Sequence, residues 1–257
     1  MKLGIDMGGM SIKMGLVNEE NKIIGRITIP TDLTVPYQTL VERMADAVRQ
    51  MLENAGMTLE QCGGIGIGSP GTIDAKQGVI LYSNNFGWEN VPIVEELKKH
   101  LDTRIEIAND ADAAALGEVC AGAAEGAENA VLLTLGTGVG SGVILDKKIF
   151  RGAMPGGCEL GHLSIRYDGI RCTCGRKGCL EAYASASALL RIAREKAAEH
   201  PESIMNEMCG NDLEQMNGKI PFDAAKAGDE AGMETVKEYE GYLACGIANV
   251  INTFRPE

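Results

Sequence analysis

Aromatic residues are scarce in this sequence: they make up 4% of its 257 residues, with a single tryptophan. Long hydrophobic runs are also missing, and no apolar stretch approaches the roughly 18 residues that a membrane span requires. At the N-terminus an acidic residue, Asp6, arrives before an apolar signal core could form. These absences predict a cytoplasmic protein that does not cross a membrane.

Basic residues are too few to balance the acidic ones. The chain has 24 Lys and Arg against 36 Asp and Glu, which gives a net charge of −12. A surface of this sign repels phosphate backbones, so the charge argues against a nucleic-acid partner. The sequence also contains no G-x-x-x-x-G-K-[ST] segment, which excludes a P-loop protein.

The order of strands and helices indicates an α/β fold. Strand-like segments fill the first 30 residues, and apolar residues at helical spacing predict an amphipathic helix over 34–55, with Pro36 in its first turn. After residue 180 the pattern is mostly helical, with breaks at Pro201 and Pro221. Strands that feed helices through glycine turns are typical of this class. The remaining expected strands are 63–68, 104–108, 130–135 and 142–145, and the remaining expected helices are 110–124 and 228–253.

Two glycine turns could hold phosphate groups. The first is Gly8-Gly9, which follows Asp6 at a strand end, and the second spans residues 135–142 between two strands. Glycines let backbone N–H groups approach phosphate oxygens, and Asp6 could order Mg²⁺ through water. A glycine hairpin explains either turn equally well when it is taken alone.

Asn109-Asp110 stands where a strand passes into a helix. An acidic residue is favoured at a helix N-terminus, so a capping role is the simpler interpretation from sequence alone. The functional interpretation is a carboxylate that accepts the proton of a sugar hydroxyl during attack on a γ-phosphate. Asp112, two residues further on, is expected to take no part.

Three of the eight cysteines crowd into residues 172–179, and a histidine stands ten residues before the first of them. Three thiolates and one imidazole make a closed tetrahedral Zn²⁺ site without a vacant position, which is typical of structural zinc. A redox C-x-x-C pair is absent. The alternative is three buried cysteines beside an unrelated histidine. The predicted ligands are His162, Cys172, Cys174 and Cys179.

Glu159 and Glu181 bracket this cluster. If a metal fixes the loop, both carboxylates are held near one point, where they suit the recognition of sugar hydroxyls.

Taken together, these residues resemble the ROK family of sugar kinases and related repressors, which have the actin-like ATPase (ribonuclease H-like) fold. The resemblance covers nearly the whole chain. Residues 159–162 match the pattern E-x-G-H, and residues 172–181 match C-x-C-G-x-x-G-C-x-E without a gap. Residues 135–140 carry the second glycine turn. The resemblance implies two α/β domains, 1–108 and 109–257, with a cleft between them, and a homodimer.

The resemblance implies phosphorylation of a hexose, most often on O6, with ATP and Mg²⁺, and it makes Asp110 the catalytic base. The implied sugar ligands are Gly71, Asn84, Asn85, Asn109, Glu159, His162 and Glu181, with His162 also holding zinc. The implied phosphate-binding residues are Asp6, Gly8, Gly9, Ser11, Lys13, Gly136, Thr137, Gly138 and Gly140.

Two departures from the family pattern bear on nucleotide binding. Met10 stands where the family usually has Thr after the Gly-Gly pair, although Ser11 supplies a neighbouring hydroxyl. The residues given end at Glu257, before the strand and G-G-G turn with which the family cradles adenosine. We therefore expect these residues alone to hold ATP weakly.

The leading hypothesis is a glucokinase-like enzyme of glycolysis. N-acetylmannosamine, N-acetylglucosamine or fructose are alternative substrates, because the same residue types bind their hydroxyl groups. Hypotheses of another class are a catalytically silent sugar-binding protein and a ROK-type regulator. A regulator of this family needs an N-terminal helix-turn-helix, whereas the first phosphate turn already begins near residue 4.

Overall fold

The computed structural model describes residues 1–257, which form two compact units. The first unit comprises Met1–Leu132, Gly142–Cys158 and Glu257, and the second comprises Leu133–Ser141 and Glu159–Pro256. The domain boundary expected after residue 108 stays a prediction. The architecture is mixed α/β, as the sequence predicts, and it contains three sheets.

A five-stranded sheet in the order β3-β2-β1-β4-β8 forms the centre of the first unit. Strands β1, β2 and β3 are antiparallel, whereas β4 and β8 run parallel to β1. The bounds are β1 Lys2–Met7, β2 Ser11–Val17, β3 Ile23–Pro30, β4 Ile65–Ser69 and β8 Ile105–Asn109. The carboxyl ends of β1, β4 and β8 share an edge, where Asp6 pairs with Gly68 and Ser69 with Asn109. Ligands commonly bind at this edge of parallel sheets.

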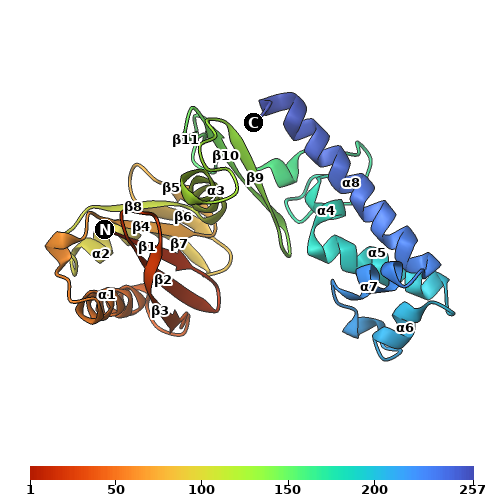
Figure 1. The fold of residues 1–257 in the computed structure, drawn as a ribbon, viewed down its shortest axis with the longest axis horizontal. Coiled ribbons are helices and arrows are strands. Elements are labelled where there is room, and N and C mark those ends of the chain that lie inside the picture. The colour runs from red at the N-terminus through yellow and green to blue at the C-terminus, as the bar shows by residue number, and fades with distance from the viewer. The chain divides into compact units, whose positions relative to one another are not determined.

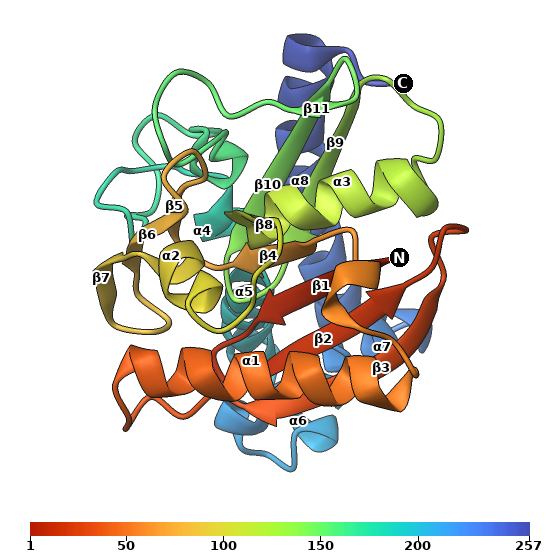
Figure 2. The same cartoon turned by 90° about the vertical axis from the view of Figure 1, so that its left-hand side faces the viewer.

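Alternation of buried and exposed residues along β1 places Leu3, Ile5 and Met7 on the face that helix α1 covers (Figure 2). Helix α1 runs over Tyr37–Asn54, and Pro36 is its N-cap, so it begins three residues later than the predicted start near Thr34. A residue before proline disfavours the helical region, which explains the later start. A short 3-10 helix, Leu59–Gln61, follows α1, and helix α2, Ile93–Lys98, adds buried residues to the same core.

Helix α3, Asp110–Ala121, packs against β4 on the opposite face of the sheet from α1 (Figure 1). Gly68 lies directly under the start of α3: a Cβ at that position would be in van der Waals contact with Ala113 Cβ (3.4 Å) and Asp110 Cα (3.6 Å). The close packing brings the first turn of α3 directly to the carboxyl edge of β4 and β8.

A second, antiparallel sheet is formed by β5 Thr72–Asp74, β6 Val79–Ser83 and β7 Trp88–Val91. These strands are not among those expected from the sequence. They have three to five residues each, and Gly78, Gly87 and Asn90 interrupt them with positive φ. Segments this short carry too little periodicity to be recognised from sequence.

The third sheet has the order β11-β10-β9, and the chain passes through it from one unit to the other. Its strands are β9 Ala130–Leu135, β10 Val139–Leu145 and β11 Lys148–Ile149.

The second unit is mostly helical, as predicted. Pro221 was expected to break the helical pattern but stands in the first turn of α7, where proline's missing N–H costs nothing. Its helices are α4 Glu181–Ala184, α5 Ala186–Glu199, α6 Ile204–Met208, α7 Ile220–Lys226 and α8 Glu230–Phe254, with 3-10 helices at Leu160–His162 and Leu213–Gln215.

Asp229 joins two helices of this unit. Its carboxylate accepts hydrogen bonds from the N–H of Gly232 (2.8 Å), the hydroxyl of Ser203 (2.8 Å) and the N–H of Ile204 (3.0 Å). We expect Asp229→Ala to lower the free energy of unfolding by about 2 kcal/mol, because an N-cap and charge-assisted bonds are lost together. Chemical denaturation measures this. Asp212→Ala, which uncaps only an exposed 3-10 helix, is the control and should cost less than about 0.5 kcal/mol.

The same carboxyl makes the stability depend on pH. Burial raises the pKa of Asp229, but the N–H of Gly232, the Ser203 hydroxyl and the N–H of Ile204 bring the pKa below its usual value of 3.8. The stabilisation is therefore complete above the unfolded pKa and disappears as pH falls through the folded one. Equal acid sensitivity of the wild-type protein and Asp229→Ala would contradict this assignment.

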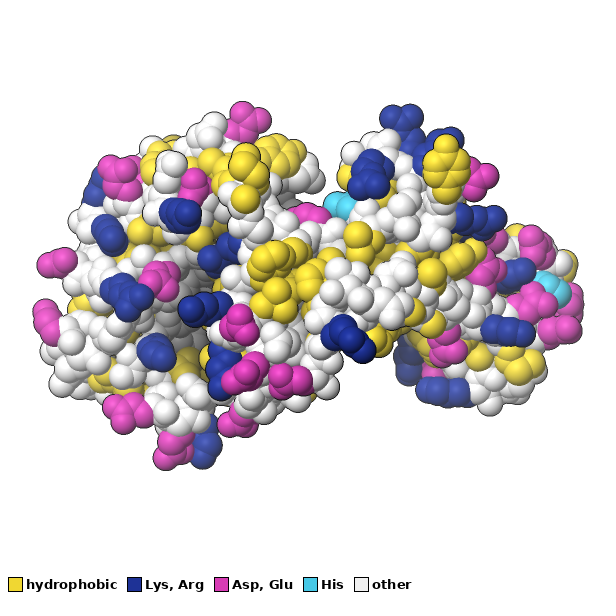
Figure 3. Space-filling view, turned by 90° about the horizontal axis from the view of Figure 1, so that it is seen from above, with side chains coloured by type: hydrophobic (Ala, Val, Ile, Leu, Met, Phe, Trp, Pro, Cys, Tyr) yellow, Lys and Arg dark blue, Asp and Glu magenta, His cyan; other side chains and the backbone are white.

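None of the helices is both long and apolar enough to cross a membrane. On the face shown in Figure 3, acidic and basic side chains are interspersed over each unit rather than gathered into one basic surface.

Candidate functional site

The junction of β8 and α3 presents Asp110 to solvent. Asn109 caps the helix: its Oδ1 accepts from the N–H of Ala111 (2.9 Å) and Asp112 (3.5 Å), while its Nδ2 donates to the Gly71 carbonyl (3.1 Å). Asp110 is exposed, and its Oδ1 accepts from the N–H of Ala111 at 2.9 Å. The capping role thus belongs to Asn109, which leaves the Asp110 carboxylate accessible to a substrate.

The loop at Gly71 can be formed only by glycine. Its φ is +112°, and a Cβ there would collide with the Tyr82 carbonyl. Asn84 and Asn85 follow on the loop after β6, and both are exposed. Asn84 Oδ1 accepts from the Tyr82 hydroxyl at 3.5 Å, and Asn85 Nδ2 lies near Gly9. Asn85 thus lies beside the first glycine turn, as Asn109 lies beside Gly71, and all of these residues belong to the first unit.

The first glycine turn connects β1 to β2. The N–H of Gly8 donates to the Ser11 carbonyl (3.0 Å), and the Thr31 hydroxyl donates to the Gly8 carbonyl (2.6 Å). Asp6 and Lys13 form an exposed ion pair at 3.9 Å. Met10 is 91% exposed, so the departure from the family's usual Thr projects into solvent rather than into the core.

The second glycine turn is held by helices α4 and α5. The N–H of Ala186 donates to the Gly136 carbonyl (2.8 Å), and the Ser187 hydroxyl donates to the Thr137 carbonyl (2.9 Å). On the β10 side, the N–H of Val139 donates to Glu181 Oε2 (3.0 Å). Gly136 and Thr137 are exposed, so their backbone is open to a ligand.

The four predicted metal ligands converge in the second unit. One ligand atom from each of His162, Cys172, Cys174 and Cys179 lies within 4.8 Å of all the others. Cys172 Sγ is 3.7 Å from His162 Nδ1, and Cys174 Sγ is 3.7 Å from Cys179 Sγ. Tetrahedral zinc with thiolate bonds of about 2.3 Å separates its sulfur ligands by about 3.8 Å, so these distances fit the ion. The positive φ of Gly175 and Gly178 turns the loop back on itself.

The donor chemistry also fits a cation. Burial raises the pKa of Cys179 to about 12 and raises the pKa of Cys172, whereas the backbone N–H of Arg176 lowers the pKa of Cys174. Three thiolates held this close repel one another, and a divalent cation offsets that repulsion. These residues form a possible metal site.

Glu159 and Glu181 lie on either side of the cluster in the same unit. Glu159 precedes the short 3-10 helix that ends at His162, and its carbonyl accepts from the His162 N–H at 3.0 Å. Glu181 is the first residue of α4, and its Oε1 lies 3.5 Å from Cys172 Sγ. Both residues thus adjoin the loop 163–178 that carries two of the cysteines (the metal loop), and the Glu181 carboxylate contacts it.

Comparison with known proteins identifies the family of this chain. Residues 2–257, almost the whole chain, match the ROK family. The chain belongs to the ROK family. A protein named glucokinase from Thermotoga maritima is 36% identical over 256 residues, which are 99% of this chain and 79% of that protein.

Two solved structures of the family are similar to this ROK protein. One is a ROK family glucokinase from Streptomyces griseus in complex with glucose and AMPPNP, with 31% identity, TM-score 0.78 and coverage of 99% of this chain and 80% of that one. The other is a ROK hexokinase from Thermus thermophilus, with 32% identity, TM-score 0.82 and coverage of 99% and 78%. These similarities confirm the predicted family and fold class.

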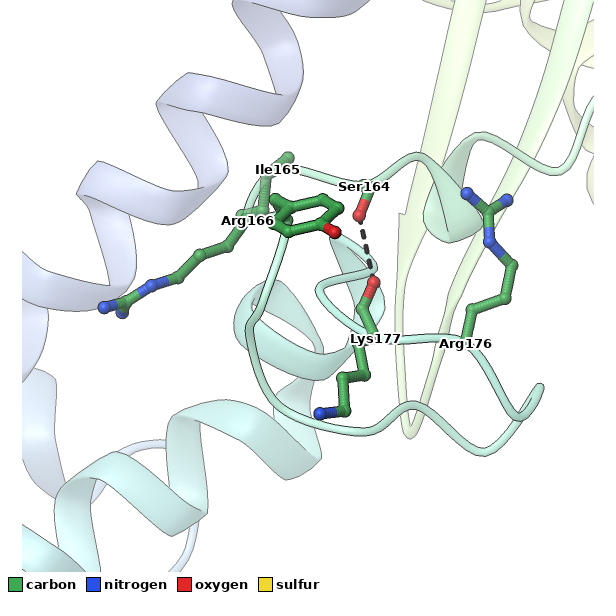
Figure 4. Close-up of a pocket in the computed structure, with 6 residues that line it drawn as sticks. Ser164, Ile165, Arg166, Arg176 and Lys177 are labelled. Atoms are coloured by element: carbon green, nitrogen blue, oxygen red, sulfur yellow. Dashed lines mark hydrogen bonds between the residues drawn. The ribbon is translucent and has the colours of Figure 1, made fainter.

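One pocket of about 500 Å³ lies on the metal loop of this ROK protein, and the predicted sugar ligands do not line it (Figure 4). The side chains of Arg166 and Arg176 point away from each other there, and the Ser164 hydroxyl donates to the Lys177 carbonyl at 2.9 Å. None of the predicted phosphate ligands lines this pocket either.

Asp112 is a functional candidate, although the sequence led us to expect no role for it. It is 4% exposed, and Arg151 Nε donates to its Oδ2 at 3.3 Å. Burial raises the pKa of Asp112, against the opposing effect of the Arg151 charge. This ion pair ties the segment after β11 to the first turn of α3, beside Asp110. The sequence offered no signal for it, because the partners stand 39 residues apart.

The predicted sugar ligands are divided between the units. Gly71, Asn84, Asn85 and Asn109 belong to the first unit with Asp110, whereas Glu159, His162 and Glu181 belong to the second with the metal ligands.

Proposed function

We propose that this ROK protein is an ATP-dependent hexose kinase that phosphorylates glucose on O6. The carrying observation is the exposed Asp110 carboxylate at the carboxyl edge of the parallel strands, in a chain 36% identical to a glucokinase. The glucose and AMPPNP bound to the related Streptomyces griseus enzyme support the same two substrates.

In the proposed reaction, Asp110 accepts the proton of the sugar O6 hydroxyl while O6 forms its bond to the γ-phosphorus. The bond between the γ-phosphorus and the bridging oxygen breaks, and the electron pair leaves on ADP. Asp110 is the first residue of α3, and its exposed carboxylate can reach a bound substrate. Asn109 keeps one amide hydrogen beyond its bond to Gly71, and this hydrogen can bind a sugar hydroxyl.

We assign the remaining roles as the resemblance implies. The sugar ligands are Gly71, Asn84, Asn85, Asn109, Glu159, His162 and Glu181. The phosphate ligands are Asp6, Gly8, Gly9, Ser11, Lys13, Gly136, Thr137, Gly138 and Gly140, with Mg²⁺ near Asp6.

We propose Zn²⁺ as the ion of the Cys/His cluster. Four protein ligands leave no position for water, so the ion would fix the loop that carries His162 and Glu181 and would have no part in the chemistry. We further propose that the protein acts in glycolysis in the cytoplasm as a homodimer.

A coupled assay against a hexose panel tests the function. We expect kcat/KM for glucose to exceed that for N-acetylmannosamine, N-acetylglucosamine and fructose by at least about tenfold, the discrimination that a few pocket contacts supply. A higher value for another hexose would change the substrate. Calorimetric sugar binding without turnover of any hexose would instead favour a silent sugar-binding protein or a regulator.

A further inference from the structure

Glu181 connects the metal loop to the second glycine turn. One carboxylate oxygen, Oε2, accepts the N–H of Val139 in that turn at 3.0 Å. The other, Oε1, accepts the hydroxyl of Thr173 at 3.1 Å and lies 3.5 Å from Cys172 Sγ. Thr173 stands between two metal ligands, Cys172 and Cys174. A single side chain thus bridges the metal loop and the turn proposed to hold phosphate.

The fit between Glu181 and the turn is close. A Cβ on Gly138 would collide with Glu181 Oε2, so only glycine allows the carboxylate to reach the Val139 N–H. The other hydrogen bonds that anchor the turn come from Ala186 and Ser187 and hold the carbonyls of Gly136 and Thr137. Glu181 is therefore the anchor on the β10 side of the turn, and its own position depends on Thr173.

We propose that Glu181 is a positioning residue that transmits the geometry of the metal loop to the phosphate turn, so that the metal centre controls nucleotide binding as well as sugar binding. This inference rests on the proposed kinase function. A carboxylate held at both oxygens has one orientation, and charge-assisted bonds to N–H and O–H groups are the stronger ones. When the bond to Thr173 is lost, the carboxylate can turn away and release Val139.

Thr173→Val tests the bridge, because it removes the hydroxyl and leaves all four metal ligands in place. With the metal content measured and unchanged, we expect amide hydrogen exchange of Val139 to accelerate about tenfold, and KM for ATP to rise by a similar factor, the value of one charge-assisted bond. KM for glucose should rise as well, because Glu181 is also a proposed sugar ligand, so the exchange of the Val139 amide is the measurement that isolates the bridge. Removing the metal from the wild-type protein should accelerate the same amide.

Thr173→Ser keeps the hydroxyl and should restore both the slow exchange and the KM for ATP. Thr253→Val, at an exposed threonine of α8 that bonds only its own helix, is the matched control and should change neither. Unchanged exchange of Val139 in metal-loaded Thr173→Val would overturn the bridge, even if the wild-type protein is an active kinase. Accelerated exchange in a protein without kinase activity would support the bridge and overturn the proposed function.

Discussion

Asp110→Asn is expected to lower kcat by about a thousandfold, whereas the affinity for glucose stays within a few-fold of the wild-type value. An amide cannot accept the O6 proton, so the substitution removes general-base catalysis. The amide side chain has nearly the same shape as the carboxyl group. Its oxygen can still accept a hydrogen bond from the N–H of Ala111, as Asp110 Oδ1 does at 2.9 Å. The helix start and the cap by Asn109 are therefore preserved.

Turnover is measured by the coupled assay and glucose binding by calorimetry. Glu106→Gln is the matched control, because Glu106 is an exposed acid on β8, the strand that leads into Asp110, and pairs with Arg104. It should leave both quantities unchanged. Turnover of Asp110→Asn near the wild-type rate would refute Asp110 as the base, and loss of glucose affinity in step with kcat would make it a binding residue.

Cys174→Ser is expected to release the metal and to abolish most glucose binding without unfolding the first unit. A serine hydroxyl is a poor zinc ligand at neutral pH, and we expect metal affinity to fall by more than about 100-fold, the upper range for losing an outer-shell partner. The loop 163–178 has few buried side chains of its own, so its conformation depends on the ion. His162 and Glu181 then lose their fixed positions.

The hydrophobic cores explain why loss of the metal should disturb only the metal loop. The first unit has its own cluster around β1, β4 and α1, and the helices after residue 186 pack around residues such as Ile192 and Tyr239. Neither cluster contains a metal ligand.

Elemental analysis gives the metal per chain, calorimetry gives glucose binding, and circular dichroism follows the helices. The control is Cys245→Ser, at an exposed cysteine of α8 outside the cluster. Full metal content with normal glucose affinity in Cys174→Ser would contradict the assignment of this ligand. Collapse of the whole fold on metal removal would contradict a loop-restricted role.

The metal site could be predicted from sequence because its information is local. Its ligands fall within residues 162–179, and the spacing with Gly175 and Gly178 already allows convergence on one ion. Asp110 was predicted less sharply, because an acidic residue at a helix start has two explanations. The structure separates them, since the side chain of Asn109 provides the cap and leaves the Asp110 carboxylate exposed.

Other features exist only in the folded chain. The strands β5, β6 and β7 are too short to show a period, and they form because each lies beside the next. The pair Asp112–Arg151 and the bond from Val139 to Glu181 join residues 39 and 42 positions apart.

The family and the α/β class of this protein are determined by its sequence alone, because patterns over short stretches specify them, and the same kind of pattern predicts the metal ligands and Asp110. Only the tertiary structure decided which side chain caps α3, which carboxylate is buried and which carboxylate bridges two loops. Those roles depend on burial and on contacts between distant segments, and a linear pattern of residue types contains neither.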